Sequence, residues 1–232
     1  MTRAESLPTA SLLRWQALAR ILPFALYIVF LALGPLVARA FPQWDARWLY
    51  AAQIGAVLAG LTFFARDYAE LARPARLRRG DWLLAAAAGT AVFALWVNLD
   101  APWASFGEAA GFDPSRADGS LDWALVAVRL FGAVAVVPVM EELFWRSFVL
   151  RWLDREDFLA LAPAAASLRG LLLSSLLFGL EHHLWLAGLL AGLAYGGLYR
   201  RSGSLWPPVA AHALTNLLLG LWVLHGGHWR FW

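Results

Sequence analysis

Three short clusters of polar residues lie within apolar sequence in the second half of the chain. They are Glu141-Glu142 with Arg146, Phe178 with His182, and His212 with Asn216. A charged side chain inside a membrane span costs several kcal/mol, so each cluster needs a reason to be there. Carboxylate and imidazole groups are the side chains that most often transfer protons in enzymes. The residue types therefore predict a functional polar site among apolar helices.

The spacing within the first cluster separates its two carboxylates. Glu142 and Arg146 lie four residues apart with the acid first, which is the favourable order for an ion pair along one helix face. Glu142 can therefore be neutralised locally. Glu141 is rotated by about 100° from its neighbour, so it faces a different surface and stays available for chemistry.

The three clusters are also expected to lie at a similar depth in the membrane. Counted from the nearest Arg patch at about 1.5 Å per residue, the depth is roughly 20 Å for His182, roughly 16 Å for His212 and roughly 15 Å for Glu141. Asn216 projects from the same side of its helix as His212, and Phe178 can cover one side of His182. A structural ion pair or a packed histidine would explain any single cluster. Three clusters at one depth predict one shared polar cavity.

The composition places these helices in a membrane. Of the 232 residues, 61% are hydrophobic and 15% are charged, and the mean hydropathy is +0.59. An ordinary soluble domain is nearer one half apolar. The absence of Cys excludes disulfides, Cys-ligated zinc and a thiol nucleophile. The pI of about 9.8 does not indicate nucleic-acid binding, because the Arg residues flank the apolar runs instead of forming one stripe.

Apolar runs of about the length needed to cross a bilayer recur along the chain. They lie at residues 21–41, 49–65, 82–99, 123–152, 170–183, 184–199 and 205–224. They lack the alternation of barrel strands, so the sequence predicts an all-α, polytopic membrane bundle of seven to eight transmembrane helices. The eighth helix would arise if the fourth run is split or bent near Pro138.

The distribution of Arg predicts the orientation of this bundle. Residues 66–81 hold five Arg, including Arg73 and Arg76, whereas residues 100–122 hold one. By the positive-inside rule, the first loop is cytoplasmic, and so is the N-terminus with Arg3. The Ala-rich, Lys-free composition suggests that the membrane is a bacterial inner membrane.

Turn-forming residues at 103–119 predict a boundary in the chain. We expect N-terminal transmembrane helices over 1–120, a catalytic helix bundle over 121–224 and a short solvated tail over 225–232. The Gly-rich run at 188–197 predicts close helix packing.

The ordered motifs Glu-Glu-x-x-x-Arg, Phe-x-x-x-His and His-x-x-x-Asn resemble the CAAX prenyl protease type II family, whose bacterial relatives are called CPBP or Abi intramembrane proteases. The resemblance covers residues 121–224, and it is similar to a subset linked to exosortase-type C-terminal sorting systems. It implies a catalytic set made of Glu141, Glu142, Arg146, His182, His212 and Asn216. In this family a Glu and a His activate water, here Glu141 and His182, while His212 and Asn216 would stabilise the oxyanion.

The residues leave the use of a metal open. Glu141, His182 and His212 could bind a divalent ion such as zinc with one open position. The chain has no His-Glu-x-x-His helix, however, which is the usual zinc peptidase motif.

The sequence therefore favours an intramembrane endopeptidase that cleaves a membrane-associated or C-terminally processed peptide. Its expected partners are a peptide or protein substrate and the lipid bilayer, with no nucleic acid. One alternative is a non-catalytic membrane protein for bacteriocin self-immunity or scaffolding. Another is a small transporter that uses the Glu–His cavity as a proton relay, but the chain shows no inverted repeat.

Overall fold

The computed structural model describes residues 9–72, 77–107 and 111–232. Arg3, Arg73 and Arg76, which contributed to the predicted orientation, lie outside these residues. The N-terminal half contains α1 (Thr9–Ala40), α2 (Leu49–Phe63), α3 (Ala69–Ala72) and α4 (Arg79–Asn98). The C-terminal half contains α5 (Trp123–Phe131), η4 (Gly132–Val136), α6 (Val137–Glu142), η5 (Leu143–Val149), α7 (Leu150–Trp152), α8 (Leu168–Glu181), α9 (Trp185–Ser202) and α10 (Trp206–Gly226).

Short 3₁₀ turns connect these helices. They are η1 (Ala46–Trp48), η2 (Ala65–Asp67), η3 (Pro102–Ala104), η6 (Phe158–Ala160), η7 (Pro163–Ala165) and η8 (Trp229–Phe231). In the described residues the only β pairing is an isolated bridge between Ser115 and Leu121. The fold is all-α, as predicted.

Four helical segments among the described residues are long and apolar enough to cross a membrane. They are Leu12–Ala40, Arg79–Asn98, Trp123–Trp152 and Trp206–Gly226. The predicted count of seven to eight spans is not confirmed. Of the other apolar runs, α2 has 15 residues and α8 has 14, so each is only about 21–23 Å long and shorter than a hydrocarbon core of about 30 Å. The run at 184–199 forms the 18-residue α9, whose last turn holds Arg200 and Arg201.

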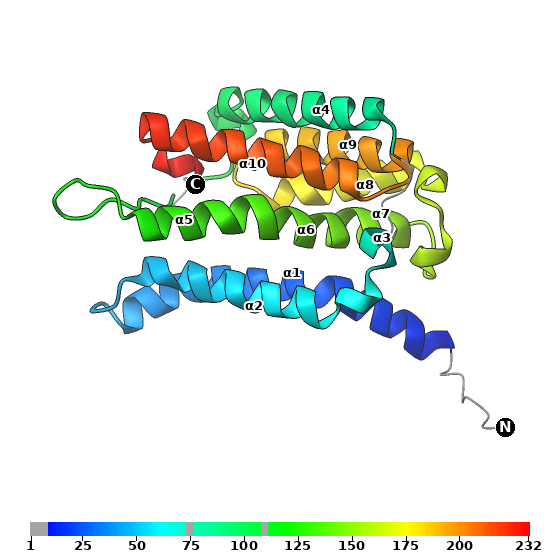
Figure 1. The fold of residues 1–232 in the computed structure, drawn as a ribbon, viewed down its shortest axis with the longest axis horizontal. Helices are drawn as coiled ribbons and strands as arrows, with labels where there is room; N and C mark the ends of the chain where they lie inside the picture. Colours follow the sequence, from blue (N-terminus) through cyan, green and yellow to red (C-terminus); the bar gives the residue numbers. More distant parts are fainter. Residues whose placement is uncertain (1–8, 73–76, 108–110) are drawn as a thin grey trace.

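The helix that runs from Trp123 to Trp152 lies at the centre of the bundle (Figure 1). The antiparallel hairpin of α1 and α2 packs on one side of it, and α8, α9 and α10 pack on the other, with α4 against α10 and α9. The segment around α3, the turn after α7 and the end of α9 share one end of the bundle, and the C-terminus lies toward the opposite end (Figure 1).

This central helix is continuous but irregular. The π-helical segments η4 and η5 flank α6, so both glutamates of the Glu141-Glu142 pair lie on one short α-helical turn between two wider ones. The expected irregularity at Pro138 therefore takes the form of a π segment directly before the proline, not a break. Proline lacks an amide hydrogen and clashes with the carbonyl four residues earlier, and a wider turn relieves both problems.

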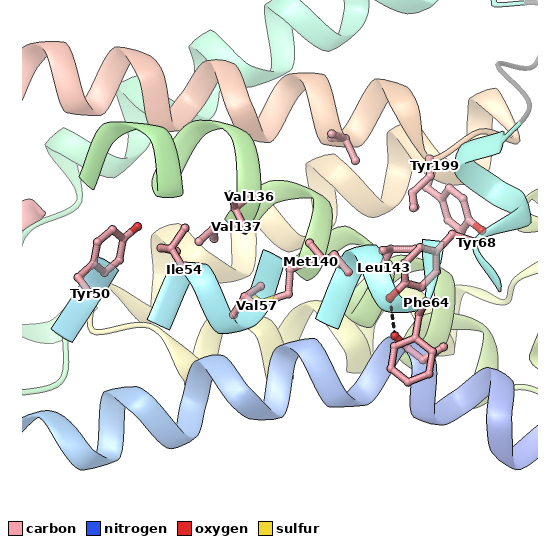
Figure 2. Close-up of a cluster of buried hydrophobic side chains, with 14 residues drawn as sticks. Tyr50, Ile54, Val57, Phe64, Tyr68, Val136, Val137, Met140, Leu143 and Tyr199 are labelled. Atoms are coloured by element: carbon pink, nitrogen blue, oxygen red, sulfur yellow. Dashed lines mark hydrogen bonds between the residues drawn. The ribbon is translucent and has the colours of Figure 1, made fainter. Parts of the chain in front are cut away.

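A buried apolar cluster fixes the central helix to the hairpin (Figure 2). It includes Tyr50, Ile54 and Val57 of α2, together with Val136, Val137, Met140, Leu143 and Tyr199. Met140 and Leu143 directly flank the two glutamates and are each 1% exposed. Packing on the hairpin side therefore orients the glutamates toward the helices on the other side.

Small residues bring the remaining helices close together. A Cβ on Gly192 would lie 2.8 Å from the Cα of Ser175, and one on Gly188 would lie 3.0 Å from the Cα of Gly179. These contacts confirm that the Gly-rich run packs closely, here against α8. On the other flank, a Cβ on Gly89 of α4 would lie 2.5 Å from the carbonyl oxygen of Ala211 in α10.

The predicted solvated tail is only partly solvated. His225 and His228 are exposed, but η8 folds back against the bundle and Trp232 is 8% exposed. Trp232 packs with Val126 of α5 and Val223 of α10. Burial of its large aromatic ring is more favourable than burial of polar side chains, so the end of the tail packs against the bundle.

Candidate active site

A cavity of about 160 Å³ lies where the central helix, α9, α10 and the end of α8 meet. Glu141, His182, His212 and Asn216 all line it, as the sequence predicted. Glu142 and Arg146 do not line it. Glu142 bonds His212, and Arg146 forms an ion pair with Glu142. The volume is large enough to hold several water molecules if polar groups are available to bind them.

Glu141 presents a free carboxylate oxygen to this cavity. Its residue is 4% exposed, and its Oε2 atom has no hydrogen-bond partner in the described part of the chain. The Nε2 atom of His212 lies 4.0 Å from Oε2. A buried carboxylate that is not committed to a structural bond can accept a proton from a reactant.

Glu142 and Arg146 hold His212 from behind. The predicted ion pair is confirmed, with Arg146 Nε 3.0 Å from Glu142 Oε2. The other carboxylate oxygen, Oε1, lies 3.0 Å from His212 Nδ1. Because a carboxylate accepts, Nδ1 donates to it, and Nε2 is directed toward Glu141 and the cavity.

Aromatic rings enclose this charged group. Tyr195 stacks on His212 with ring centroids 5.1 Å apart, and the Arg146 guanidinium lies 4.4 Å from the centroid of Phe178. The Tyr195 hydroxyl donates to Thr215 Oγ1 at 2.7 Å, and Thr215 in turn donates to the carbonyl of Gly89 at 2.8 Å. The imidazole position is therefore fixed by packing as well as by its carboxylate.

His182 lies just beyond α8, because the helix ends at Glu181 and His182 is its C-cap with extended backbone. Its Nδ1 atom bonds the carbonyl oxygen of Phe178 at 2.7 Å, which leaves Nε2 free for the cavity. The expected contact with the Phe178 ring is present, at 4.6 Å between centroids. The contact arises from a turn at the helix end instead of from two positions on one helix face.

Asn216 shares the cavity with His212 but already uses one amide hydrogen. Its Nδ2 atom donates to the carbonyl oxygen of Ala133 in η4 at 2.7 Å. That carbonyl belongs to the π segment, where the regular helical ladder is disturbed. The bond orients the amide, and the second Nδ2 hydrogen remains available to a ligand.

A second, larger cavity of about 800 Å³ adjoins the first. The residues common to both are Trp96, Arg129, His182, Phe231 and Trp232. Glu181 lines the second cavity, and its Oε2 accepts a hydrogen bond from Trp145 Nε1 at 3.1 Å. We call these the inner cavity and the outer cavity.

Sequence reasoning missed Arg129, Tyr195 and Thr215 as lining residues of the inner cavity. Thr215 lies inside the His-x-x-x-Asn motif, so a polar side chain beside two motif residues was an available signal. Arg129 was another, because it is a charged residue inside the apolar run at 123–152.

The three residues considered for a metal do not form a ligand set here. No group of three or more His, Cys, Asp or Glu side chains in the described residues is arranged to hold a metal ion. Glu141 and His212 approach each other, and both His212 and His182 bond through Nδ1, which leaves each Nε2 atom toward the cavity as in many zinc sites. The mutual spacing of the three groups in the described residues, and not the orientation of the rings, is what does not fit a three-ligand zinc centre.

The comparison with known families agrees with the location of this site. Residues 123–218 match the family described as Type II CAAX prenyl endopeptidase Rce1-like, which is less than half of the chain. No curated protein and no solved structure significantly matches the chain. The matched residues run from α5 into α10 and contain all six predicted catalytic residues. Over these residues the chain is similar to the Rce1-like Type II CAAX prenyl endopeptidases.

Proposed function

We propose that the chain is an intramembrane endopeptidase that hydrolyses a membrane-associated peptide with a water molecule held by Glu141 and His182. The observation that carries this proposal is the free Oε2 oxygen of Glu141, which faces His212 across the inner cavity. A buried, unpaired carboxylate oxygen is costly, and here it lies 4.0 Å from the imidazole of His212 at a cavity that His182 also lines and that admits water. The Rce1-like match of the same segment supports the same reaction.

In the proposed reaction Glu141 acts as the general base. It takes a proton from the water while the oxygen attacks the peptide carbonyl carbon, and a tetrahedral intermediate forms. The C–N bond then breaks, and the proton held by Glu141 passes to the leaving amine. Nε2 of His182 accepts a hydrogen bond from the water and so orients it.

His212 and Asn216 stabilise the negative oxygen of the intermediate. When His212 is an imidazolium, Nδ1–H donates to Glu142 and Nε2–H donates to the oxyanion, together with the free amide hydrogen of Asn216. Before attack, the two carboxylates, the Arg146 guanidinium and the imidazolium sum to zero net charge. After attack, Glu141 is neutral and the oxyanion carries the negative charge, so the sum stays zero. A neutral sum limits the cost of holding four charges in a buried site.

The test uses purified protein in proteoliposomes with a library of lipid-anchored peptides, read by mass spectrometry. We expect discrete cleavage products from the natural sequence and none from Glu141→Gln or His182→Ala. Asp118→Asn, an exposed change in the loop before α5 that lines neither cavity, is the matched control. Equal cleavage by all of these proteins would remove the assigned mechanism. Cleavage by none would favour the non-catalytic role in immunity or scaffolding.

We infer that the substrate is processed at its C-terminal side in a bacterial inner membrane, as in exosortase-associated members of such families. The orientation has the N-terminus, Arg66 and the Arg200–Arg201 pair in the cytoplasm, following the positive-inside rule. Because the chain has no Cys, single cysteines at positions 66 and 116 can report the side directly. A membrane-impermeant maleimide should label position 116 in intact cells and position 66 only after lysis, and the reverse pattern would invert the topology.

A further inference from the structure

Arg129 is the one arginine that lines both cavities. It lies in α5, inside the membrane-spanning segment Trp123–Trp152, and is half-buried. The guanidinium lies 4.4 Å from the ring centroid of Tyr50 and 5.4 Å from that of Phe112. Aromatic rings contact the faces of a guanidinium, and they leave its N–H edges for another partner.

No acidic partner for Arg129 is found among the described residues. Each of the buried arginines Arg20, Arg146 and Arg151 forms an ion pair with a glutamate. The Nε atom of Arg129 is buried without a hydrogen-bond partner. A charged group inside a membrane span is expensive unless it is paired, so an unpaired one at a cavity wall indicates a function.

Among the described residues, the two acidic side chains that line the outer cavity have partners other than Arg129. Glu181 accepts the Trp145 indole hydrogen, and Asp100 forms an ion pair with Arg230 at the rim of the outer cavity. Arg129 is thus a cation that faces the path between the outer cavity and Glu141, with donors left over for a ligand.

We propose that Arg129 binds a carboxylate of the peptide substrate and thereby sets where the peptide lies relative to Glu141. This inference rests on the proposed function. An arginine recognises a carboxylate with two parallel N–H donors, and the contact carries charge and direction together. The carboxylate is either the free C-terminus of the peptide or the side chain of an Asp or Glu.

The position of Arg129 limits the distance between the carboxylate and the cleaved bond. Twelve residues of helix separate it from Glu141, which corresponds to roughly 18 Å along the axis. An extended peptide spans about 3.4 Å per residue, and the two side chains line the same inner cavity, so the carboxylate lies at most roughly five residues from the cleaved bond.

The test measures kcat and KM for short N-acylated leucine–alanine peptides in proteoliposomes. The four probes are a free acid, its C-terminal amide, the amide with one internal Glu, and the amide with Gln in that place. The proteins are wild type, Arg129→Gln, Arg129→Lys, and Arg116→Gln as the control. Arg116 is a more exposed arginine that lines neither cavity. Binding of fluorescent forms of the probes and thermal stability are measured in parallel.

We expect wild type and Arg116→Gln to prefer one carboxylate-bearing probe by about 10- to 100-fold in kcat/KM, mainly through KM. Arg129→Gln should lose that preference, so that its kcat/KM no longer differs between the carboxylate-bearing and neutral probes, and Arg129→Lys should recover part of it. A preference for the free acid identifies the C-terminus, and a preference for Glu over Gln identifies a side chain.

Three outcomes would overturn the assignment. One is equal kcat/KM and equal binding of all four probes by wild type. Another is a loss by the same factor for every probe in Arg129→Gln, as a structural role would predict. Binding selectivity that survives in Arg129→Gln would also refute it. Wild-type binding of carboxylates without any cleavage would instead reject the proposed endopeptidase and keep the carboxylate site.

Discussion

The central helix contributes residues to two buried polar clusters that differ in how completely their charged side chains are paired. The clamp cluster consists of Arg20, Glu70, Ser147 and Arg151, and the cavity cluster consists of Glu141, Glu142, Arg146 and His212. Both contain carboxylates opposite arginines, and both join the central helix to other elements. They differ in how many of their polar atoms have partners.

In the clamp cluster, the charged side chains bond one another. Glu70 is bound by Arg20 at 2.7 Å, by Arg151 at 3.3 Å and by the Ser147 hydroxyl. Arg20 also donates to the carbonyl oxygen of Gln16 at 2.8 Å. A saturated network of this kind ties α1 and α3 to the central helix and has nothing left to bind a reactant.

The cavity cluster leaves atoms without partners. Among the described residues these include Glu141 Oε2 and both terminal nitrogens of Arg146. The contrast teaches that a buried charge by itself does not indicate catalysis in this protein. An unused acceptor beside a cavity does, because buried polar atoms are normally bonded unless function requires otherwise.

Glu141→Gln tests the catalytic role of the cavity cluster, and it has the largest expected effect on peptide cleavage. Loss of the general base should lower kcat for peptide cleavage by about 1,000-fold. Thermal stability in detergent should hardly change, because Oε2 has no bond to lose. A variant that keeps its activity, or that unfolds readily, would place Glu141 in a structural role like that of Glu70.

Glu70→Ala should produce the opposite pattern. It leaves Arg20 and Arg151 buried without their shared carboxylate, which should cost about 3–5 kcal/mol of folding free energy. The activity of the molecules that remain folded should be unchanged. Asp45→Ala, which removes a partly exposed ion pair with Arg47, is the matched control and should cost less than about 1 kcal/mol. Unfolding in detergent measures both, and equal small losses would show that the clamp cluster is dispensable.

The difference between the clusters also explains how much could be predicted from sequence. Glu142 and Arg146 pair through helix geometry, so spacing alone predicted their bond. Residue counts between Arg patches predicted that Glu141, His182 and His212 share one cavity, since each helix rises at a fixed rate, and all three line the inner cavity.

Contacts between distant segments could not be predicted in this way. Glu70 lies 50 residues from Arg20, and the partner of His212 lies 70 residues away. Nothing in local spacing specifies such pairs. The predicted number of spans was not confirmed for a different reason. The apolar runs at 49–65 and 170–183 show that these segments are hydrophobic but not where their helices end, and α2 and α8 end after 15 and 14 residues.

Glu142→Gln tests whether the second glutamate of the cavity cluster acts through His212. The amide can still accept a hydrogen bond from His212, but it no longer provides a negative charge to an imidazolium. We expect kcat to fall by about 100-fold with little change in KM, a smaller loss than for Glu141→Gln, because Glu142 acts through His212. Steady-state kinetics on one cleavable peptide separate the two constants. A loss seen only in KM would mean that Glu142 contributes to substrate binding instead.

Gly89→Ala tests whether the close packing of α4 against α10 positions His212 in the cavity cluster. The added Cβ would lie 2.5 Å from the carbonyl oxygen of Ala211, the residue before His212, so α4 and α10 must separate. We expect a loss of about 1–3 kcal/mol in stability and a modest loss in kcat as His212 shifts. Gly197→Ala is the matched control, because its Cβ meets nothing within 4 Å. Alanine also favours a helix interior by about 1 kcal/mol, so the control should be neutral or stabilising. If both alanines behave alike, the close approach of α4 does not position His212, and Glu142 and Tyr195 alone hold the ring.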